Sequence, residues 1–330
     1  MSILINILIL SGGVVLLLAG GEFLVRGAVT LAGRMGVSTL VIGLTVVAFG
    51  TSAPELAFNV TASINDHNEL SLGNIVGSNI ANIGLILGLA ALLKPLKVNS
   101  SVIRREMPVM IGATALMVVL AALPIEDRSL SRVDGIILLA FFAGLSSFAL
   151  IAATRSRRGE DWGETFESDI EEVSERDRRR PAWLALLLVL VGLGMLGAGV
   201  RLAETGAVGI AVDLNLSRTL IGLTIVALAT SLPELATSLI AVRRGQVDIA
   251  VGNVVGSNIF NILLVLGTTA VVRPVECGDA SIESFAVMGF LAAVLWFPIS
   301  RTAGQRVSRL EGLFLLLVYL AYMAYEVITL

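Results

Sequence analysis

The sequence predicts an all-α polytopic membrane protein with ten transmembrane helices arranged as two inverted five-helix repeats. Hydrophobic residues make up 56% and charged residues 15% of the 330 residues, whereas soluble domains carry about 25% charged residues. Apolar runs of about 20 residues, the length that crosses a bilayer as a helix, recur along the whole chain. One stretch of the first half also returns in the second half, 179 residues later.

Ten spans are expected where apolar runs lie between charged or turn-rich breaks. They cover residues 3–25, 37–62, 70–93, 104–123, 131–153, 182–205, 216–242, 249–272, 282–299 and 308–328. The first five form a unit at 1–153, and the last five form a second unit at 182–330. Residues 154–181 are dense in both signs of charge and are expected to be a solvated linker. No basic residue precedes the first run, which favours a first span over a cleaved signal peptide.

The distribution of Lys and Arg predicts the orientation, because basic loops stay on the cytoplasmic side of a membrane. If the N-terminus lies outside, the inner connections carry 18 of the 23 basic residues, seven of them within 154–181. Both termini are therefore predicted to face outside and the linker to face the cytoplasm. The expected location is the cytoplasmic membrane.

The composition also argues against several classes of protein. Basic residues are spread among short loops, so a nucleic-acid partner is not expected. The single Cys277 rules out an intrachain disulfide framework. With one loop histidine and no HExxH motif, an enzyme is not expected. Nothing indicates a cofactor or an obligate protein partner, which leaves ions and the lipid bilayer as the expected partners.

The internal repeat preserves polar residues inside the predicted spans. Over the repeated stretch, 21 of 41 positions are identical. Two motif pairs carry the repeat: GLTVVAFGTSAPELA (43–57) with GLTIVALATSLPELA (222–236), and GNIVGSNIANI (73–83) with GNVVGSNIFNI (252–262). An odd number of spans per unit places the second unit in the membrane upside down. Inverted repeats of this kind hold a transporter's substrate site near the midplane, between the units.

Glu55 and Glu234 lie well inside predicted spans. An ionisable side chain there costs roughly 2.5–3.5 kcal/mol and usually marks an ion pathway. Pro54 and Pro233 precede them, and each proline frees a backbone carbonyl one turn back. Such carbonyls are tolerated where they line a cavity or bind an ion. Because the Pro-Glu pair recurs in both units, a simple helix kink is the weaker interpretation.

Further oxygen donors share a helix face with each acid in the spans 37–62 and 216–242, and others line one face of the spans 70–93 and 249–272. The first group comprises Ala48, Thr51 and Ser52 and, in the second unit, Ala227, Thr230 and Ser231. The second group comprises Asn74, Ser78 and Asn82 and, in the second unit, Asn253, Ser257 and Asn261. Calcium takes six to eight oxygen ligands and sodium is also a hard cation, whereas softer metals favour imidazole or thiolate. These residues therefore predict a calcium or sodium site. Bonds within a helix are the alternative role for the hydroxyls, and helix packing is the alternative for the asparagines.

Both halves resemble the alpha repeats of the sodium/calcium exchangers, within the cation/calcium antiporter superfamily. The likeness spans all ten predicted helices and is most specific at GTSAPE (50–55), ATSLPE (229–234), GNIVGSN (73–79) and GNVVGSN (252–258). It implies a prokaryotic-type antiporter that exchanges calcium for sodium by alternating access and extrudes calcium electrogenically. The 28 residues of the linker are too few for the calcium-sensing domains of animal exchangers.

The resemblance also implies individual roles. Glu55 and Glu234 would bind both calcium and sodium. Sodium ligands would be the hydroxyls of Thr51, Ser52, Ser78, Thr230, Ser231 and Ser257 and the carbonyls of Ala48 and Ala227, with Asn82 at the centre of the site. Asn261 departs from the pattern, because microbial relatives can carry an Asp at this position. The site would then hold two acids instead of three.

Two other functions remain open from the sequence. A cation channel usually obtains its acidic rings from oligomeric symmetry around a pore, whereas these acids form one pair within a single chain. Calcium/proton exchange is the closer alternative. The hydroxyls beside both acids favour sodium, because a cycle that moves only protons needs no such ligands.

Overall fold

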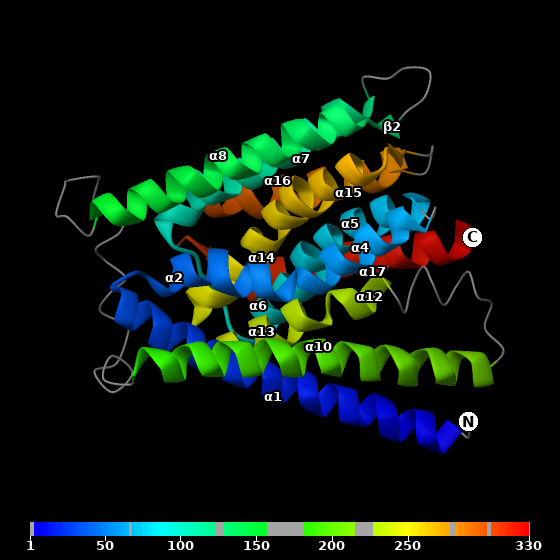
Figure 1. Cartoon of the computed structure of the whole chain (residues 1–330), viewed down its shortest axis with the longest axis horizontal. Coiled ribbons are helices and arrows are strands. Elements are labelled where there is room, and N and C mark those ends of the chain that lie inside the picture. Colours follow the sequence, from blue (N-terminus) through cyan, green and yellow to red (C-terminus); the bar gives the residue numbers. More distant parts are fainter. Residues whose placement is uncertain are drawn as a thin grey trace.

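The computed structural model describes residues 3–65, 68–122, 129–156, 181–214, 227–277, 281–301 and 305–329. These residues form an elongated bundle of helices (Figure 1). Helices α1 and α10 lie together along one edge of the bundle and α8 lies along the opposite edge, with shorter, interrupted helices between them. The N- and C-terminal ends of the chain lie at the same end of the bundle.

The first half of the chain contains helices, π-helical turns (η) and two short strands. In order they are α1 (Ile3–Met35), α2 (Thr39–Ile42), η1 (Gly43–Val47), α3 (Ala48–Thr51), α4 (Ala53–Ile64), α5 (Asn68–Ala81), η2 (Asn82–Leu87), α6 (Gly88–Leu93), β1 (Leu96–Lys97), η3 (Val102–Glu106), α7 (Met107–Ala122), β2 (Ser129–Leu130) and α8 (Arg132–Ser156).

The second half contains a closely related series. It comprises α10 (Ala182–Asp213), α12 (Ala227–Thr230), α13 (Leu232–Arg243), α14 (Val247–Phe260), η6 (Asn261–Leu266), α15 (Gly267–Val272), β3 (Val275–Glu276), α16 (Ser281–Arg301), β4 (Arg306–Val307) and α17 (Arg309–Thr329). Residues 216–226 of the seventh predicted span and residues 157–180 of the predicted linker lie outside the described residues.

Two spans are interrupted at a serine. Ser52 separates α3 from α4 with φ −83° and ψ 3°, and Ser231 separates α12 from α13 with φ −86° and ψ 1°. Pro54 and Pro233 lie in the first turn of the helix that follows, where a missing N–H costs no bond within that helix. The carbonyl one turn earlier loses its usual donor. The interruption expected at both Pro-Glu pairs is thus present.

Two further spans contain a π-helical turn beginning at an asparagine. The turn η2 begins at Asn82 and η6 begins at Asn261. Single π-helical turns inside α-helices are rare and frequently occur at functional sites. The sequence pattern predicts helices here but gives no indication of the wider turn.

The two halves are related in space as well as in sequence. Elements α4, α5, η2, α6 and β1 recur 179 residues later as α13, α14, η6, α15 and β3. Strand β1 pairs antiparallel with β4, while β3, the counterpart of β1, pairs antiparallel with β2. Such reciprocal pairing is what an approximate two-fold relation between two units produces. Neither two-stranded ribbon was expected from the sequence.

Helices α1 and α10 approach each other closely through glycines. A Cβ atom on Gly13 would lie 2.4 Å from the backbone nitrogen of Ala203, and one on Gly20 would lie 2.9 Å from the carbonyl oxygen of Gly192. The contacts run in opposite order along the two chains, so the helices are antiparallel. Small residues are what allows two membrane helices this close an approach.

Both helices of this pair are longer than expected. The sequence predicts ends at residues 25 and 205, but α1 ends at Met35 and α10 ends at Asp213. The continuation of α1 contains Arg26 and Arg34, which hydropathy reads as a break, whereas the continuation of α10 (GAVGIAVD, 206–213) is apolar up to Asp213 and the predicted boundary was simply too early. The continuation of α1 carries an i,i+4 ion pair between Glu22 and Arg26 at 2.7 Å, which supports helix across a polar stretch. Arg244, at the end of α13, also binds Glu22.

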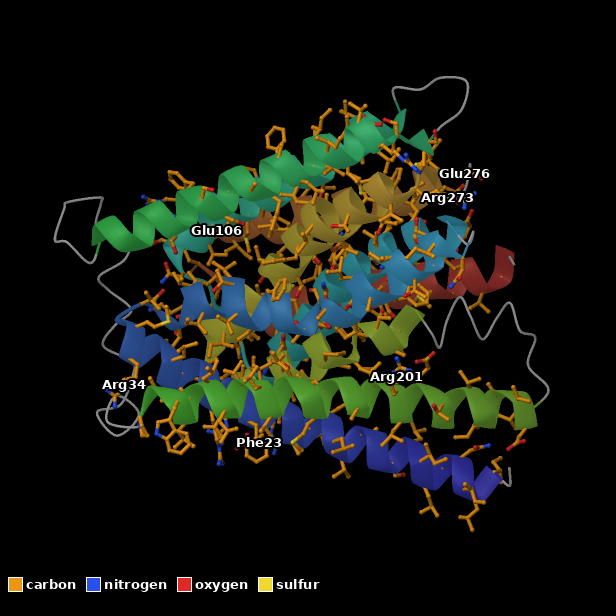
Figure 2. All side chains as sticks on the ribbon, viewed as in Figure 1. Phe23, Arg34, Glu106, Arg201, Arg273 and Glu276 are labelled. Carbon is orange, nitrogen blue, oxygen red and sulfur yellow. The ribbon has the colours of Figure 1, made fainter. Side chains whose placement is uncertain are left out.

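Six helical stretches of the described chain are long and apolar enough to cross a membrane. They are Ile3–Met35, Thr39–Ile64, Ser71–Leu93, Ala182–Asp213, Val247–Val272 and Arg309–Ile328. Each of the six overlaps one predicted span, and the first and fourth extend beyond it. Figure 2 shows Arg34 at one end of the bundle and Arg273 and Glu276 at the other. The orientation argument assigns Arg34 and Arg273 to opposite sides of the membrane, and which side is cytoplasmic stays a prediction.

Gly192→Val should weaken the contact between α1 and α10, because its Cβ would lie 2.6 Å from the backbone nitrogen of Leu24. Overpacking of this kind typically costs about 1–3 kcal/mol of stability. We expect a lower thermal midpoint in detergent, followed by fluorescence-detected size exclusion. Gly194→Val on the same helix is the matched control, since nothing lies within 4 Å of a Cβ at that position. Equal midpoints for the two variants would contradict the packing.

Candidate ion-binding site

Glu55 and Glu234 are buried in the centre of the bundle, with 1% and 0% of their surface exposed. Each lies in the first turn after a serine break, in α4 and α13. No basic side chain of the described residues forms an ion pair with either acid. A buried charge without a partner is strongly unfavourable, so the site needs a cation or a proton to compensate it.

Hydroxyl groups from both halves converge on Glu234. Ser52 donates from its Oγ to Glu234 Oε1 at 3.2 Å, and Ser257 donates to the same oxygen at 3.5 Å. Ser52 belongs to the break in the first half, whereas Ser257 and Glu234 belong to the second. The two broken helices therefore meet at one carboxylate.

Two equivalent hydrogen bonds join the broken helices to the helices beside them. Thr51 Oγ1 donates to Asn253 Oδ1 at 3.0 Å, and Asn74 Nδ2 donates to Thr230 Oγ1 at 3.0 Å. Each bond links one half of the chain to the other. Asn74 and Asn253 thus make the packing bonds that were the alternative to ion binding, and they fix the positions of two hydroxyls next to the acids.

A second equivalent pair crosses the site between the π-helical turns and their neighbours. Asn82 Nδ2 donates to Asn258 Oδ1 at 2.9 Å, and Asn261 Nδ2 donates to Asn79 Oδ1 at 3.4 Å. In both bonds the amide nitrogen is engaged. The carbonyl oxygens of Asn82 and Asn261 have no partner among the described residues and are thus available to a cation.

Asn59 and Ser238 support the acids and were not predicted. Asn59 Nδ2 donates to the backbone carbonyl of Glu55 at 2.7 Å and to Asn74 Oδ1 at 2.8 Å. In the second half, Asn253 Nδ2 donates to the backbone carbonyl of Glu234 at 3.4 Å and to Ser238 Oγ at 3.0 Å, so Ser238 acts through Asn253. Both residues lie four positions after an acid, which is the signal that could have found them. The repeat did not mark them because their residue types differ.

Half of the twelve predicted ligand residues have buried, unpaired oxygen atoms. Within the described part of the chain, the atoms without a hydrogen-bond partner include both carboxylate oxygens of Glu55, Glu234 Oε2, the hydroxyls of Ser78 and Ser231, and the amide oxygens of Asn82 and Asn261. Buried polar atoms are rarely left unpaired in proteins. Seven unpaired oxygens fit a hard cation, which takes oxygen ligands.

Two predicted carbonyl ligands differ in their surroundings. The Ala48 carbonyl accepts bonds from the Ser52 backbone N–H at 3.0 Å and from Thr51 Oγ1 at 3.3 Å, so its assignment as an ion ligand stays a prediction. The side chain of Ala227 and the turn before it lie outside the described residues. No cluster of three or more His, Cys, Asp and Glu residues was found among the described residues, consistent with a site that depends on neutral oxygens.

A family model described as sodium/calcium exchanger protein matches residues 5–151 and 184–328. The chain belongs to the sodium/calcium exchanger family. The resemblance seen in the sequence motifs is thereby confirmed. Because the matched residues cover nearly the whole chain, the relationship is not limited to the short motifs around the acids.

Individual proteins also align with most of the chain. The sodium/calcium exchanger MaX1 of Methanosarcina acetivorans is 33% identical over 344 residues, covering 97% of this chain and 98% of MaX1. The inner membrane protein YrbG of Escherichia coli is 41% identical over 264 residues, covering 80% of this chain and 79% of YrbG. The structure of the sodium-calcium exchanger NCX_Mj soaked with sodium aligns with a TM-score of 0.79 and 29% identity, covering 98% and 99% of the two chains.

Replacing either acid should abolish calcium binding. Glu55→Gln or Glu234→Gln removes a charge that a buried divalent cation needs, and we expect at least a hundredfold loss of affinity in calorimetric titrations with calcium. Glu276→Gln is the matched control, because it makes the same chemical change at an exposed strand residue. Wild-type calcium affinity in Glu55→Gln would refute the assignment.

Proposed function

We propose that this protein is a secondary active antiporter that exchanges calcium for sodium across the membrane by alternating access. The observation that carries the proposal is the pair of buried acids, Glu55 and Glu234, contributed by equivalent helices of the two halves and surrounded by unpaired oxygens. Two carboxylates balance the charge of one calcium ion. Sodium ions can balance the same charge by using the neutral oxygens as additional ligands.

The proposed architecture is ten spans in two inverted repeats, with the ion site near the membrane midplane. Support comes from the antiparallel course of α1 and α10, which occupy equivalent places in the two halves, and from the reciprocal pairing of the ribbons. Interrupted helices at the repeat interface are the usual location of an ion site in transporters of this kind. Relative motion of the two halves would expose the site to one side at a time.

Coupling follows from the electrostatics of the site. If both acids were empty and ionised, two like charges would remain in a low-dielectric interior without a cation, at a high energetic cost. Crossing the membrane is therefore far easier when the site holds calcium or sodium than when it is empty. A carrier that crosses only when loaded must return with the other ion, and this requirement produces exchange instead of leak.

Individual sodium ligands are proposed from the same set of oxygens. Ser52, Ser78, Ser231 and Ser257 offer hydroxyls next to the acids, and Thr51 and Thr230 are held beside them by the asparagine bonds. Asn261 supplies an amide oxygen where an acid would add a third charge. With a site charge of −2, more than two sodium ions per calcium would carry net positive charge across the membrane, and exchange would be electrogenic.

We further propose that the protein resides in the cytoplasmic membrane with both termini outside. The distribution of basic residues supports this orientation. A cell-negative potential would then favour calcium extrusion, because each net charge that crosses is worth roughly 2.3 kcal/mol per 100 mV. Calcium/proton exchange is the less favoured alternative, since both the family and the hydroxyl ligands point to sodium.

The exchange can be tested by calcium-45 uptake into proteoliposomes. We expect rapid uptake when the vesicles are loaded with sodium and no uptake above background when they are loaded with potassium or choline, because only sodium can replace calcium at the acids. An imposed pH gradient without sodium should not drive uptake. Uptake that follows the pH gradient alone would instead establish a calcium/proton exchanger.

The same vesicles test whether exchange moves net charge. With sodium inside and calcium outside, a valinomycin-clamped potential that is positive inside should speed calcium uptake, because more positive charge leaves with sodium than enters with calcium. Glu55→Gln vesicles provide the control for leak. Uptake that is unchanged by the imposed potential would show that exchange is electroneutral.

A further inference from the structure

The ribbon formed by β1 and β4 places two cations directly opposite each other. Leu96 is paired with Val307, and Lys97 is paired with Arg306. The first pair is buried, whereas Lys97 and Arg306 are exposed. Like charges directly across two antiparallel strands repel each other and destabilise the pair. No ion pair joins either cation to a carboxylate within the described residues.

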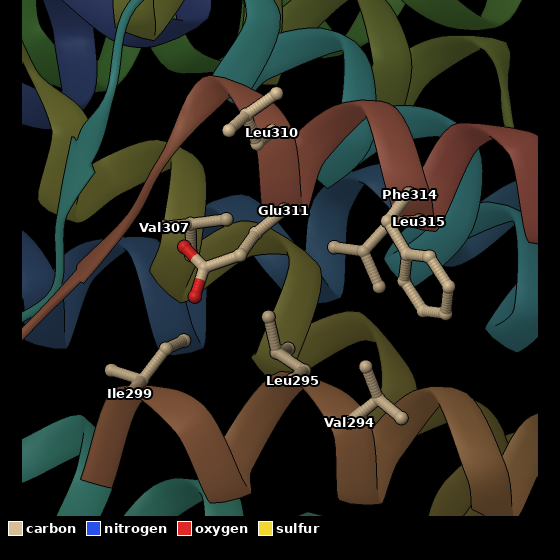
Figure 3. A pocket seen from close by; sticks show the side chains of 8 residues that line it. All are labelled: Val294, Leu295, Ile299, Val307, Leu310, Glu311, Phe314 and Leu315. Carbon is tan, nitrogen blue, oxygen red and sulfur yellow. The ribbon is translucent and has the colours of Figure 1, made fainter. Parts of the chain in front are cut away.

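An apolar crevice begins next to this pair of cations. It lies between α16 and α17 and has a volume of about 280 Å³ (Figure 3). Its lining residues are Val294, Leu295, Ile299, Val307, Leu310, Glu311, Phe314 and Leu315. Val307 lines the crevice and follows Arg306 in the same strand, so the backbone of β4 borders the crevice while the Arg306 side chain leaves from the other face of the ribbon.

Glu311 lines the crevice, and its carboxylate already accepts a hydrogen bond. Glu311 Oε2 accepts a hydrogen bond from the backbone N–H of Ser308 at 2.6 Å. Glu311 is in the first turn of α17, where a negative charge is also stabilised by the helix dipole. The exposed cations Lys97, Arg306 and Arg309 therefore outnumber the carboxylates at this end of the crevice.

Two of the apolar side chains that line the crevice are exposed at the surface of the protein. Leu310 is 79% exposed and Phe314 is 46% exposed. At the far end of the same two helices the gap is bridged, since Tyr322 Oη donates to Ser284 Oγ at 3.2 Å. The two helices thus leave an apolar slot at one end only, next to the basic ribbon.

The second ribbon of the protein shows that these cations are not required by the fold. In the second ribbon, Glu276 of β3 takes the place of Lys97. Ser129 of β2, which is paired with Glu276, takes the place of Arg306. The fold therefore tolerates a pair with no cation at equivalent positions. The basic pair is a feature of one end of the molecule, the end that the charge distribution assigns to the cytoplasmic side.

We propose that this crevice binds one anionic phospholipid, with an acyl chain in the slot between α16 and α17 and the phosphate between Lys97 and Arg306. The phosphate would relieve the repulsion between the two cations, and the acyl chain would cover apolar side chains. Basic pockets between membrane helices on the cytoplasmic side are suited to anionic headgroups. The site is separate from the two buried acids and does not depend on which ions are exchanged.

Native mass spectrometry of the delipidated protein in detergent tests the site, using phosphatidylglycerol and phosphatidylcholine with identical acyl chains. We expect one tightly bound phosphatidylglycerol and at least tenfold weaker binding of phosphatidylcholine. Lys97→Gln/Arg306→Gln should lower phosphatidylglycerol affinity about tenfold to thirtyfold, given the usual contribution of a basic residue at an anionic headgroup. Val294→Trp should fill the slot and also weaken binding, although it changes no charge.

Arg132→Gln/Arg201→Gln is the matched control, because it removes two positive charges away from this crevice and should leave lipid binding unchanged. If the double variant at the ribbon does not fold, Lys97→Gln alone should still lower the affinity severalfold. Equal binding of the two lipids by the wild type would overturn the proposal. Full binding by the ribbon variant, or competition by glycerophosphoglycerol without acyl chains at equal concentration, would overturn it as well.

Discussion

The burial of two carboxylates without a basic partner is the constraint on which the rest of this structure depends. Glu55 and Glu234 are almost completely enclosed, and an unpaired charge in such surroundings is very costly. The surrounding groups are mainly hydroxyls and amides, which can bind a cation but cannot neutralise an acid. We propose that the transported ions complete this interior, which would link the fold to exchange.

The interrupted helices and the two-fold relation together build this interior. Breaks at Ser52 and Ser231 place an acid at the start of a new helix in each half, where the exposed backbone N–H groups favour negative charge. Equivalent bonds from Thr51 to Asn253 and from Asn74 to Thr230 then tie the halves together across the site. Because the proposed ligands come from both halves, a relative movement of the halves would change access to all of them at once.

The sequence was sufficient for the family and for picking out the two acids that prove to be buried, because the repeat displayed the same polar residues twice, whereas the oxygen ligands stay a prediction. It was not sufficient for features that depend on three-dimensional contacts. Asn59 supports an acid but has Ser238 as its counterpart, so comparison of the halves did not mark it. The polar continuation of α1 to Met35 was missed because hydropathy detects apolar length only. The π-helical turns that begin at Asn82 and Asn261 were not predicted, because hydrophobic periodicity does not distinguish a π-helical turn from an α-helical one.

Competition between sodium and calcium for the two acids is the central claim, and calorimetric titration with calcium at increasing sodium concentrations tests it most directly. If the ions share Glu55 and Glu234, the apparent calcium affinity should fall with sodium more steeply than the first power of its concentration, because more than one sodium replaces each calcium. Choline at equal ionic strength should have no such effect. Calcium affinity that is the same in sodium and in choline would contradict a shared site.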